Sequence, residues 1–337
     1  MPTQTAAAGH ESRGRRVLVT HNTIARSAIE LLNAHGIEVF FSPPYDPSAR
    51  VAERCAALEV DAIMVRQGRI DAEVIGASPR LKVIVKHGVG VDNIDIAAAE
   101  ARGIPVLRSM GSNARAVAEH AIAMALALLK HLAPLDRAVK GGAWPKPSFI
   151  GRDIAGSVIG LVGFGAIGRE TARLASALGM DVLVHDPQAA DEVARSGFAA
   201  APSLDALLAA ADIVSLHCPL TKDTRHLINA ERLAAMKRDA FLINTARGGI
   251  IDEDALFQAL RQGTIAGAAL DSFATEPPPA DSPLWTLDNL IVTPHIAGVT
   301  AGSARAMAEI AARHIISVLD GNPPDSRSLA RATDLAV

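Results

Sequence analysis

Short apolar runs alternate with amphipathic stretches along most of the chain. The clearest instance lies between Val158 and Asp186. There, two apolar runs, 158–162 and 181–185, enclose three glycines and an amphipathic stretch from about Ile167 to Leu178. Short continuous apolar runs are typical of strands buried on both faces of a parallel sheet. This order therefore predicts a strand, a tight turn, a helix and a second strand.

The same alternation continues on both sides of this unit. The pattern predicts further strands at 16–21, 38–41, 62–65, 82–86, 105–108, 213–217, 240–244, 267–271 and 290–292. It predicts further helices at 24–34, 48–58, 71–77, 114–132, 204–211, 230–236, 252–262 and 300–319. Strands that alternate with helices indicate parallel sheets. We expect an α/β fold made of two Rossmann-like or flavodoxin-like parallel-sheet domains with a cleft between them.

The three glycines form the pattern G-x-G-x-x-G between the strand and the helix. In a dinucleotide-binding turn, Gly163 would permit the tight turn, and Gly165 would let the backbone approach a pyrophosphate. Gly168 would let the helix pack close to the sheet, and the helix dipole would face the phosphate charge. A purely structural turn is the simpler alternative. The complete order of strand, glycines, helix and strand favours a dinucleotide site.

Asp186 ends the second strand, at about the spacing at which a carboxylate accepts both hydroxyls of the adenosine ribose. A carboxylate here would repel the 2′-phosphate of NADP, and the next residues, Pro187 and Gln188, offer no cation. The sequence therefore favours NAD as the cofactor.

The chain, long enough at 337 residues for two domains, is predicted to pass between them twice. The helix at 300–319 should pack back on the first sheet, which the chain leaves near Arg108. We expect a discontinuous substrate-binding (lid) domain of residues 15–108 plus 296–337 and an NAD-binding Rossmann domain of residues 109–295. Residues 1–14 are predicted to form a disordered tail.

Composition narrows the possible partners. The net charge of −3 gives no electrostatic reason to expect nucleic acid or an anionic membrane surface. The longest apolar run, 121–129, is far short of the ~20 residues of a transmembrane helix. No signal peptide is evident, so we expect a cytoplasmic protein without a membrane partner. Cys55 and Cys218 lie in apolar segments, which indicates reduced thiols. The histidines lack metal-ligand spacing, so no metal site is predicted.

An irregular arm at 141–151 carries Trp144, a residue type enriched at interfaces. The helix before it is apolar nearly all round, which indicates burial on more than one side. Together these two features predict a homodimer.

Three residues at strand ends in the second half suit hydride transfer to a small 2-oxo acid. Arg247 is a planar, permanently charged donor for the substrate carboxylate and carbonyl. His295 titrates in the range needed to protonate the alkoxide, and Glu276 would favour its charged form. Each residue alone has a simpler explanation as a surface or capping group. Their shared place at strand ends, after a nucleotide motif, favours catalysis.

The chain resembles the D-isomer-specific 2-hydroxyacid dehydrogenases, which include 3-phosphoglycerate dehydrogenase and hydroxypyruvate/glyoxylate reductase. The resemblance extends from about Arg16 to Leu319 and implies the short form without a regulatory domain. It rests on the motifs KHGVGVDNID (86–95), NARAVAEH (113–120), GLVGFGAIG (160–168), HCPLT (217–221), NTARGGIIDEDAL (244–256), ALDSFATEPP (269–278) and TPHIAG (293–298).

The resemblance implies a role for specific positions. It makes Arg247, Glu276 and His295 the catalytic residues. The cofactor-binding set that it implies is Gly163, Gly165, Ala166, Ile167 and Gly168 at the pyrophosphate, Asp186 at the ribose, Cys218 and Pro219 on the adenine side, Ala246 and Asp271 at the nicotinamide end, and in addition Thr224, Thr245 and Gly298. The substrate-binding set is Gly68, Val89, Gly90 and Arg247.

Several questions stay open at this point. Arg66-Gln67-Gly68 departs from the family pattern, in which a serine or threonine commonly follows the arginine. Cations such as Arg66 and Lys86 suit a second anionic group on the substrate, or are ordinary surface charge. The substrate is of the phosphoglycerate, hydroxypyruvate or glyoxylate type. The alternative to an enzyme is an NAD(H)-sensing, corepressor-like binding protein on the same fold, which would bind NADH but turn it over slowly.

Overall fold

A computed structural model describes residues 13–332 of the chain, which divide into two compact units. Within that range, unit 1 consists of residues 13–112 and 304–332, and unit 2 of residues 113–303. These boundaries fall at 112/113 and 303/304, against the expected 108/109 and 295/296. The predicted tail over residues 1–14 lies almost wholly outside the described residues.

Unit 1 is built on a six-stranded sheet in the order β13-β5-β4-β3-β1-β2. Its strands pair in parallel except β13, which runs antiparallel to β5. The strands are β1 (Arg15–Val19), β2 (Ile37–Phe41), β3 (Ala62–Val65), β4 (Val83–Lys86), β5 (Val106–Arg108) and β13 (Leu329–Ala330). The helices are α1 (Arg26–Ala34), α2 (Ser48–Leu58), α3 (Ala72–Ala77), α4 (Ile96–Ala101) and α12 (Ala301–Leu319).

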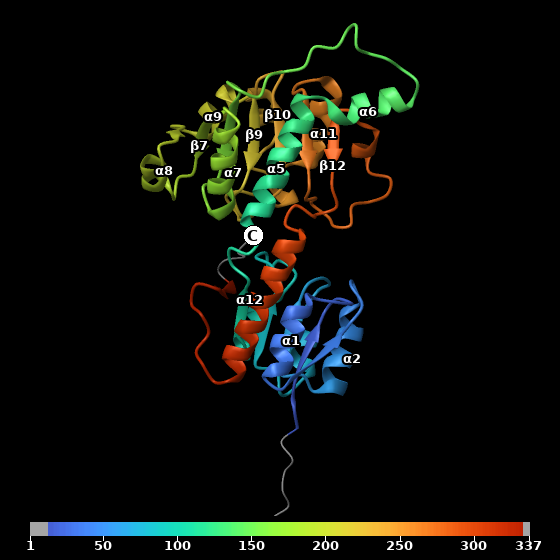
Figure 1. Cartoon of the computed structure of the whole chain (residues 1–337), viewed down its shortest axis with the longest axis vertical. Helices are drawn as coiled ribbons and strands as arrows, with labels where there is room; N and C mark the ends of the chain where they lie inside the picture. The colour runs from blue at the N-terminus through green and yellow to red at the C-terminus, as the bar shows by residue number, and fades with distance from the viewer. Residues whose placement is uncertain (1–12, 333–337) are drawn as a thin grey trace, which may run out of the picture. The chain divides into compact units, whose positions relative to one another are not determined.

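The C-terminal helix α12 completes the core of unit 1 (Figure 1). Its apolar residues, among them Ala308, Ala311 and Ile315, are fully buried together with Val17 and Val85 of the sheet. The predicted return of the chain to the first sheet is therefore confirmed.

Unit 2 is built on a seven-stranded parallel sheet in the order β12-β11-β10-β9-β6-β7-β8. The strands are β6 (Val158–Val162), β7 (Asp181–His185), β8 (Ala199–Ala200), β9 (Ile213–Leu216), β10 (Phe241–Asn244), β11 (Gly267–Leu270) and β12 (Leu290–Val292). The helices are α5 (Ala114–Leu129), α6 (Leu132–Lys140), α7 (Ala166–Ala177), α8 (Ala190–Ser196), α9 (Leu204–Ala210), α10 (Ala230–Ala235) and α11 (Glu253–Gln262), with short 3₁₀ turns η1 (Gly248–Ile250) and η2 (Pro283–Thr286).

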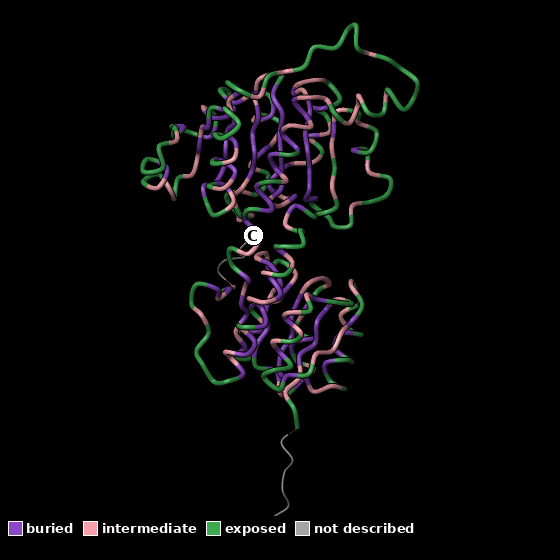
Figure 2. The backbone as a smooth tube through the Cα atoms, viewed as in Figure 1, coloured by how far each residue is buried: buried purple, intermediate pink, exposed green. Residues whose placement is uncertain are grey.

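Helices cover both faces of this sheet, and Figure 2 shows its strands as buried. α5 and α7 cover one face (Figure 1), and apolar residues of α9, α10 and α11 form the layer on the other. The chain adds β7 and β8 on one side of β6 and then returns to add β9 on the other. The order therefore reverses between β6 and β9, and in such sheets ligands bind beyond the carboxyl ends of the strands at the reversal.

The structure corrects some predicted elements. The helix predicted to run to Leu132 ends at Leu129, because His131 takes a left-handed conformation (φ 51°) and a separate helix, α6, follows. Asn113 occupies the cap position of α5 but makes no side-chain capping hydrogen bond. Asp252 does cap α11, since its carboxylate accepts from the Ala255 N–H. The short elements α4, α8, β8 and β13 were not expected.

Among residues 13–332, no single helix is long and apolar enough to cross a membrane. Within the same range, α5 and α6 have the necessary length and composition only when taken together, and they are bent by 58° where they meet. Both cysteines are free thiols, as expected, and burial raises the pKa of Cys55 to about 12.

Candidate active site and nucleotide site

The glycine turn between β6 and α7 is shaped by close backbone contacts. Gly163 has φ 101°, and a Cβ on it would lie 2.8 Å from the Cys218 backbone nitrogen. A Cβ on Gly168 would lie 2.2 Å from the Gly163 carbonyl oxygen. A Cβ on Gly165 would meet nothing within 4 Å. The first and third glycines are thus needed for packing, while the second opens space at the start of α7.

This open space fits the pyrophosphate of NAD. α7 begins at Ala166, and no side chain caps its first turn. The first N–H groups of an uncapped helix have no intrahelical partner, so those of Ala166 and Ile167 suit phosphate oxygens. The contact of these two residues with the pyrophosphate stays a prediction.

Asp186 lies directly after β7 with its carboxylate turned to the glycine turn. Its Oδ2 accepts from the Phe164 N–H at 2.7 Å, and its Oδ1 accepts from the Gln188 N–H at 2.9 Å. The two bonds fix the carboxylate in the half-buried end of the strand. Since an ionised carboxylate has about four acceptor positions, two remain for the ribose hydroxyls.

The loop after β9 carries Cys218 and Pro219. Thr224 holds this loop: its hydroxyl donates to the Pro219 carbonyl at 2.6 Å and accepts from the Thr221 N–H at 2.7 Å. Burial raises the pKa of the Cys218 thiol to about 11, so this group is neutral and serves as an apolar wall rather than a nucleophile.

Two buried polar atoms near these strand ends have no hydrogen-bond partner within the described part of the chain. They are Thr245 Oγ1, just after β10, and His217 Nδ1, just after β9. Buried polar atoms are nearly always paired, so orphaned ones indicate a missing polar group. Burial lowers the pKa of His217 to about 4, so its ring is neutral. The orphaned Thr245 hydroxyl next to the predicted nicotinamide end fits a bound NAD.

Glu276 and His295 form a direct pair in unit 2. The Glu276 Oε2 accepts a hydrogen bond from His295 Nδ1 at 2.7 Å, and its Oε1 accepts from the Phe273 N–H at 3.0 Å. Burial alone would raise the pKa of Glu276, but these two hydrogen bonds and the charges of His295 and Arg247 lower it below its ordinary value. Glu276 is therefore a carboxylate at neutral pH, and the ring of His295 keeps Nε2 free for a substrate.

Arg247 belongs to the same group of residues. It follows β10 in a turn held by Asn244, whose Nδ2 donates to the Arg247 carbonyl at 2.8 Å and whose Oδ1 accepts from the Ala246 N–H at 3.0 Å. The guanidinium also donates to the Ala246 carbonyl at 2.7 Å. Its positive charge adds to the effect of the hydrogen bonds from His295 and the Phe273 N–H in lowering the pKa of Glu276. Asn244, whose side chain is fully buried, lies in the motif at 244–256 but was not predicted as a residue of the site.

Gly248 allows the turn of Arg247 to pack closely against the loop of Glu276. Gly248 lies against the next loop so closely that a Cβ on it would be 1.9 Å from the Phe273 carbonyl carbon and 2.2 Å from the Ala274 nitrogen. Arg247 and Glu276 are thus held together by backbone packing, not only by charge.

Asp271 is fully buried at the end of β11 and holds the loop that carries His295. It accepts from the Thr293 hydroxyl at 2.5 Å and from the N–H groups of Ile296 and Ala297 at 2.8 Å each. His295 itself has φ 54°, a left-handed conformation that costs energy for a non-glycine residue. The contact of Asp271 with the nicotinamide stays a prediction, whereas its contacts with this loop are seen directly.

The predicted substrate contacts Gly68, Val89 and Gly90 lie just after strands β3 and β4 of unit 1. Lys86 donates to Asn93 Oδ1 at 2.9 Å, and Asn93 in turn donates to the Gly68 carbonyl, so the two turns are linked. The structure therefore brings these glycines together at one edge of the unit 1 sheet.

Cationic groups gather at the same edge. Arg66 donates to the Thr23 carbonyl at 2.8 Å, and burial lowers its pKa. Burial, with the charges of Arg66 and Lys86, lowers the pKa of His87 to about 4. Burial is the main reason that His87 is neutral, and the nearby charges of Arg66 and Lys86 favour an anion at this edge.

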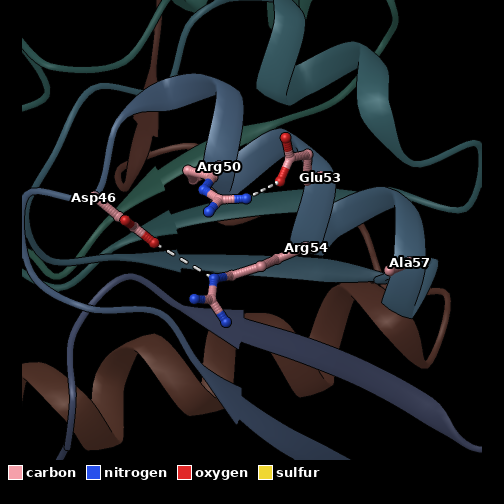
Figure 3. A pocket seen from close by; sticks show the side chains of 5 residues that line it. All are labelled: Asp46, Arg50, Glu53, Arg54 and Ala57. Carbon is pink, nitrogen blue, oxygen red and sulfur yellow. Dashed lines mark hydrogen bonds and ion pairs between the residues drawn. The ribbon is translucent and has the colours of Figure 1, made fainter.

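A hollow of about 440 Å³ on unit 1 is a poor alternative site (Figure 3). It is lined along α2 by two ion pairs, Arg50 with Glu53 at 2.8 Å and Arg54 with Asp46 at 3.4 Å. Because these charges compensate one another, the hollow offers little to a charged ligand. Within residues 13–332, no cluster of side chains is suited to a metal ion.

Comparison with known proteins gives a consistent result. Residues 122–297 match the family model described as D-isomer specific 2-hydroxyacid dehydrogenase, NAD binding domain. The chain is 40% identical over 309 residues to a D-3-phosphoglycerate dehydrogenase from Archaeoglobus fulgidus, covering 91% of this chain and 58% of that protein. It is 45% identical over 265 residues to a glyoxylate reductase from Thermofilum pendens, covering 76% of this chain and 77% of that protein.

A solved structure shows the same fold. A D-lactate dehydrogenase from Aquifex aeolicus, complexed with NAD and lactic acid, superposes with a TM-score of 0.79 at 30% identity, covering 91% of this chain and 96% of that one. The chain belongs to the D-isomer-specific 2-hydroxyacid dehydrogenase family, and unit 2 contains the family's NAD-binding domain. The predicted family, the two parallel-sheet α/β domains and the cofactor NAD are thereby confirmed. The chain spans little more than half the length of the Archaeoglobus relative.

Proposed function

We propose that the protein is an NAD-dependent dehydrogenase that interconverts a small D-2-hydroxy acid and its 2-oxo acid. The observation that carries this proposal is the 2.7 Å pair between His295 and an ionised Glu276, within reach of the charge of Arg247. The set provides a proton donor, a group that holds the donor in one orientation, and a binding group for an anionic substrate. We propose phosphoglycerate, hydroxypyruvate and glyoxylate as the substrate types.

Each residue has a separate task in the proposed reaction. Arg247 binds the carboxylate and the carbonyl oxygen of the 2-oxo acid and stabilises the charge that grows on that oxygen. NADH, when bound, supplies the hydride that adds to the carbonyl carbon. His295 donates its Nε2 proton to the resulting alkoxide and ends neutral, while Glu276 keeps the ring oriented and stabilises its charged form. In the reverse direction His295 accepts the proton.

Unit 1 is proposed to bind the substrate through Gly68, Val89 and Gly90, with Arg66 and Lys86 supplying positive charge. These residues favour a 2-oxo acid that carries a second anionic group.

The test is NADH oxidation measured against a panel of 2-oxo acids, with NADPH in parallel. Turnover of at least one acid supports the proposal. NADH binding without turnover of any acid would contradict it and favour the NAD(H)-sensing alternative.

The two reduced thiols agree with the cytoplasm as the proposed location.

Replacing Asp186 by asparagine is expected to weaken the preference for NADH over NADPH. Asparagine keeps an oxygen for the Phe164 N–H but loses the charge that binds the ribose hydroxyls and repels a 2′-phosphate. We expect the ratio of kcat/KM values for the two cofactors to fall by roughly 10–100-fold, the worth of a charge-assisted hydrogen bond. Gln188→Asn is the control and should leave the ratio unchanged. An unchanged ratio in the Asp186→Asn variant would show that Asp186 does not bind the ribose.

We also propose that the protein is a homodimer formed through α6 and the arm at 141–151. Two large apolar side chains of the arm are exposed to solvent: Trp144 is 70% exposed and Ile150 is 91% exposed. Buried in a dimer, such side chains would act as anchors. The double substitution Trp144→Ser and Ile150→Ser is expected to convert the dimer to a monomer in analytical ultracentrifugation. A wild-type monomer at micromolar concentration would exclude this interface.

A further inference from the structure

A histidine on α5 contacts the loop that carries His295. His120 Nε2 lies 3.1 Å from the Thr293 hydroxyl, and 3.9 Å from Asp271 Oδ1 behind it. The Thr293 hydroxyl in turn lies 2.5 Å from Asp271 Oδ1. His120 is three-quarters buried, with 24% of its side chain exposed. Nothing in the proposed reaction uses this residue directly.

The protons available to Asp271, Thr293 and His120 fix the direction of each hydrogen bond between them. Asp271 accepts from the N–H groups of Ile296 and Ala297 through both of its oxygens, as a carboxylate does. The Thr293 hydroxyl has a single proton, which it donates to Asp271. Towards His120 the hydroxyl is therefore an acceptor, and His120 must carry a proton on Nε2.

This series of hydrogen bonds ends at the backbone next to His295, the proposed acid. Asp271 binds the two peptide N–H groups that directly follow His295, whose own φ is 54°. A left-handed histidine keeps its conformation only where its surroundings hold it. The hydrogen bond from His120 holds Thr293, Thr293 orients Asp271, and Asp271 fixes the turn.

A second contact shows that α5 supports the same loop. Gly298, at the end of the loop, packs against Asn113 at the start of α5, where a Cβ on Gly298 would lie 2.8 Å from the Asn113 amide nitrogen. The loop from Thr293 to Gly298 therefore rests on α5 at two points, Asn113 and His120.

We propose that His120 is a positioning residue for His295. In its Nε2–H form it acts through Thr293 and Asp271 to hold the imidazole of His295 in the orientation needed for proton transfer. This inference rests on the proposed function for its kinetic consequence, but the protonation state of His120 is a property of the chain alone.

The first experiment measures that state without substrate or cofactor. Long-range ¹H–¹⁵N correlation spectra of the histidine rings, assigned with His120→Gln, are expected to show a proton on Nε2 of His120. A ring protonated only on Nδ1 would overturn the proposal, whatever the enzyme activity. Failure of every 2-oxo acid to react would instead count against the proposed function and leave this result standing.

The second experiment separates positioning from folding. We expect His120→Ala to lower kcat by about tenfold, the effect of losing one hydrogen bond in a charged network, with the KM values changed by less than about twofold. His120→Gln, whose amide donates to Thr293, should recover most of the rate, and Glu119→Ala on the exposed side of α5 should change nothing. An equal fall in kcat in the His120→Gln and His120→Ala variants would overturn the positioning role. So would an effect confined to an increase in KM.

Discussion

Replacing His295 by asparagine is expected to lower kcat for 2-oxo acid reduction by about 10²–10⁴-fold, the usual contribution of a positioned general acid. Asparagine tolerates the left-handed backbone at this position (φ 54°) but cannot donate a proton to the alkoxide. The His295 side chain is half-exposed, so folding and NADH binding should be preserved. Stopped-flow measurement of NADH oxidation, with NADH affinity from fluorescence titration, checks both expectations.

His131→Asn is a matched control for this variant. His131 also belongs to unit 2 and also has a left-handed backbone (φ 51°), but its ring contacts Phe149 and Phe241 rather than a carboxylate. We expect it to keep the wild-type kcat. Glu276→Gln, which keeps an acceptor for His295 Nδ1 but loses the charge, should lie between the two. A His295→Asn enzyme as fast as the His131→Asn enzyme would remove His295 from the mechanism.

The pattern of apolar residues was sufficient to predict the repeating elements of both units. Strands such as 62–65 and 158–162 lie where the sequence placed them, because a strand buried on both faces must be continuously apolar. The break between α5 and α6 could not be predicted in the same way. Lys130, His131 and Pro134 interrupt the apolar pattern there, but the exact end of the helix is set by the left-handed backbone of His131, a conformation with no strong signature at histidine.

In the proposed site, the residues that do the chemistry could be predicted from the sequence, but the residues that position them could not. Motifs indicated Arg247, Glu276 and His295, because hydride transfer to a 2-oxo acid requires an anchor, a proton donor and an orienting carboxylate. The residues that hold them were not evident. Asn244 acts through hydrogen bonds to the backbone of the turn that follows it, Thr293 acts through the Asp271 carboxylate, and His120 lies far from His295 in sequence. Such partners depend on which strand ends are adjacent, which only the sheet order reveals.

Replacing Gly248 by alanine is expected to destabilise unit 2 by about 3 kcal/mol or more, at the upper end of overpacking effects. A Cβ on Gly248 would lie 1.9 Å from the Phe273 carbonyl carbon, so either the turn of Arg247 or the loop of Glu276 must move. Backbone atoms cannot rotate away as a side chain does. Thermal unfolding should show a Tm lower by about 6 °C or more, and the residual folded enzyme should lose most of its kcat.

The next residue provides the control. A Cβ on Gly249 would meet the Leu220 side chain at 3.0 Å, a contact that a small rotation of the leucine relieves. We expect Gly249→Ala to cost less than about 1 kcal/mol, as volume changes do where a neighbour can adapt. Equal Tm values for the two variants would contradict the close approach of the two loops. A Gly248→Ala enzyme that is stable but slow would instead show that the Glu276 loop yields first, which separates Glu276 from Arg247 without changing either side chain.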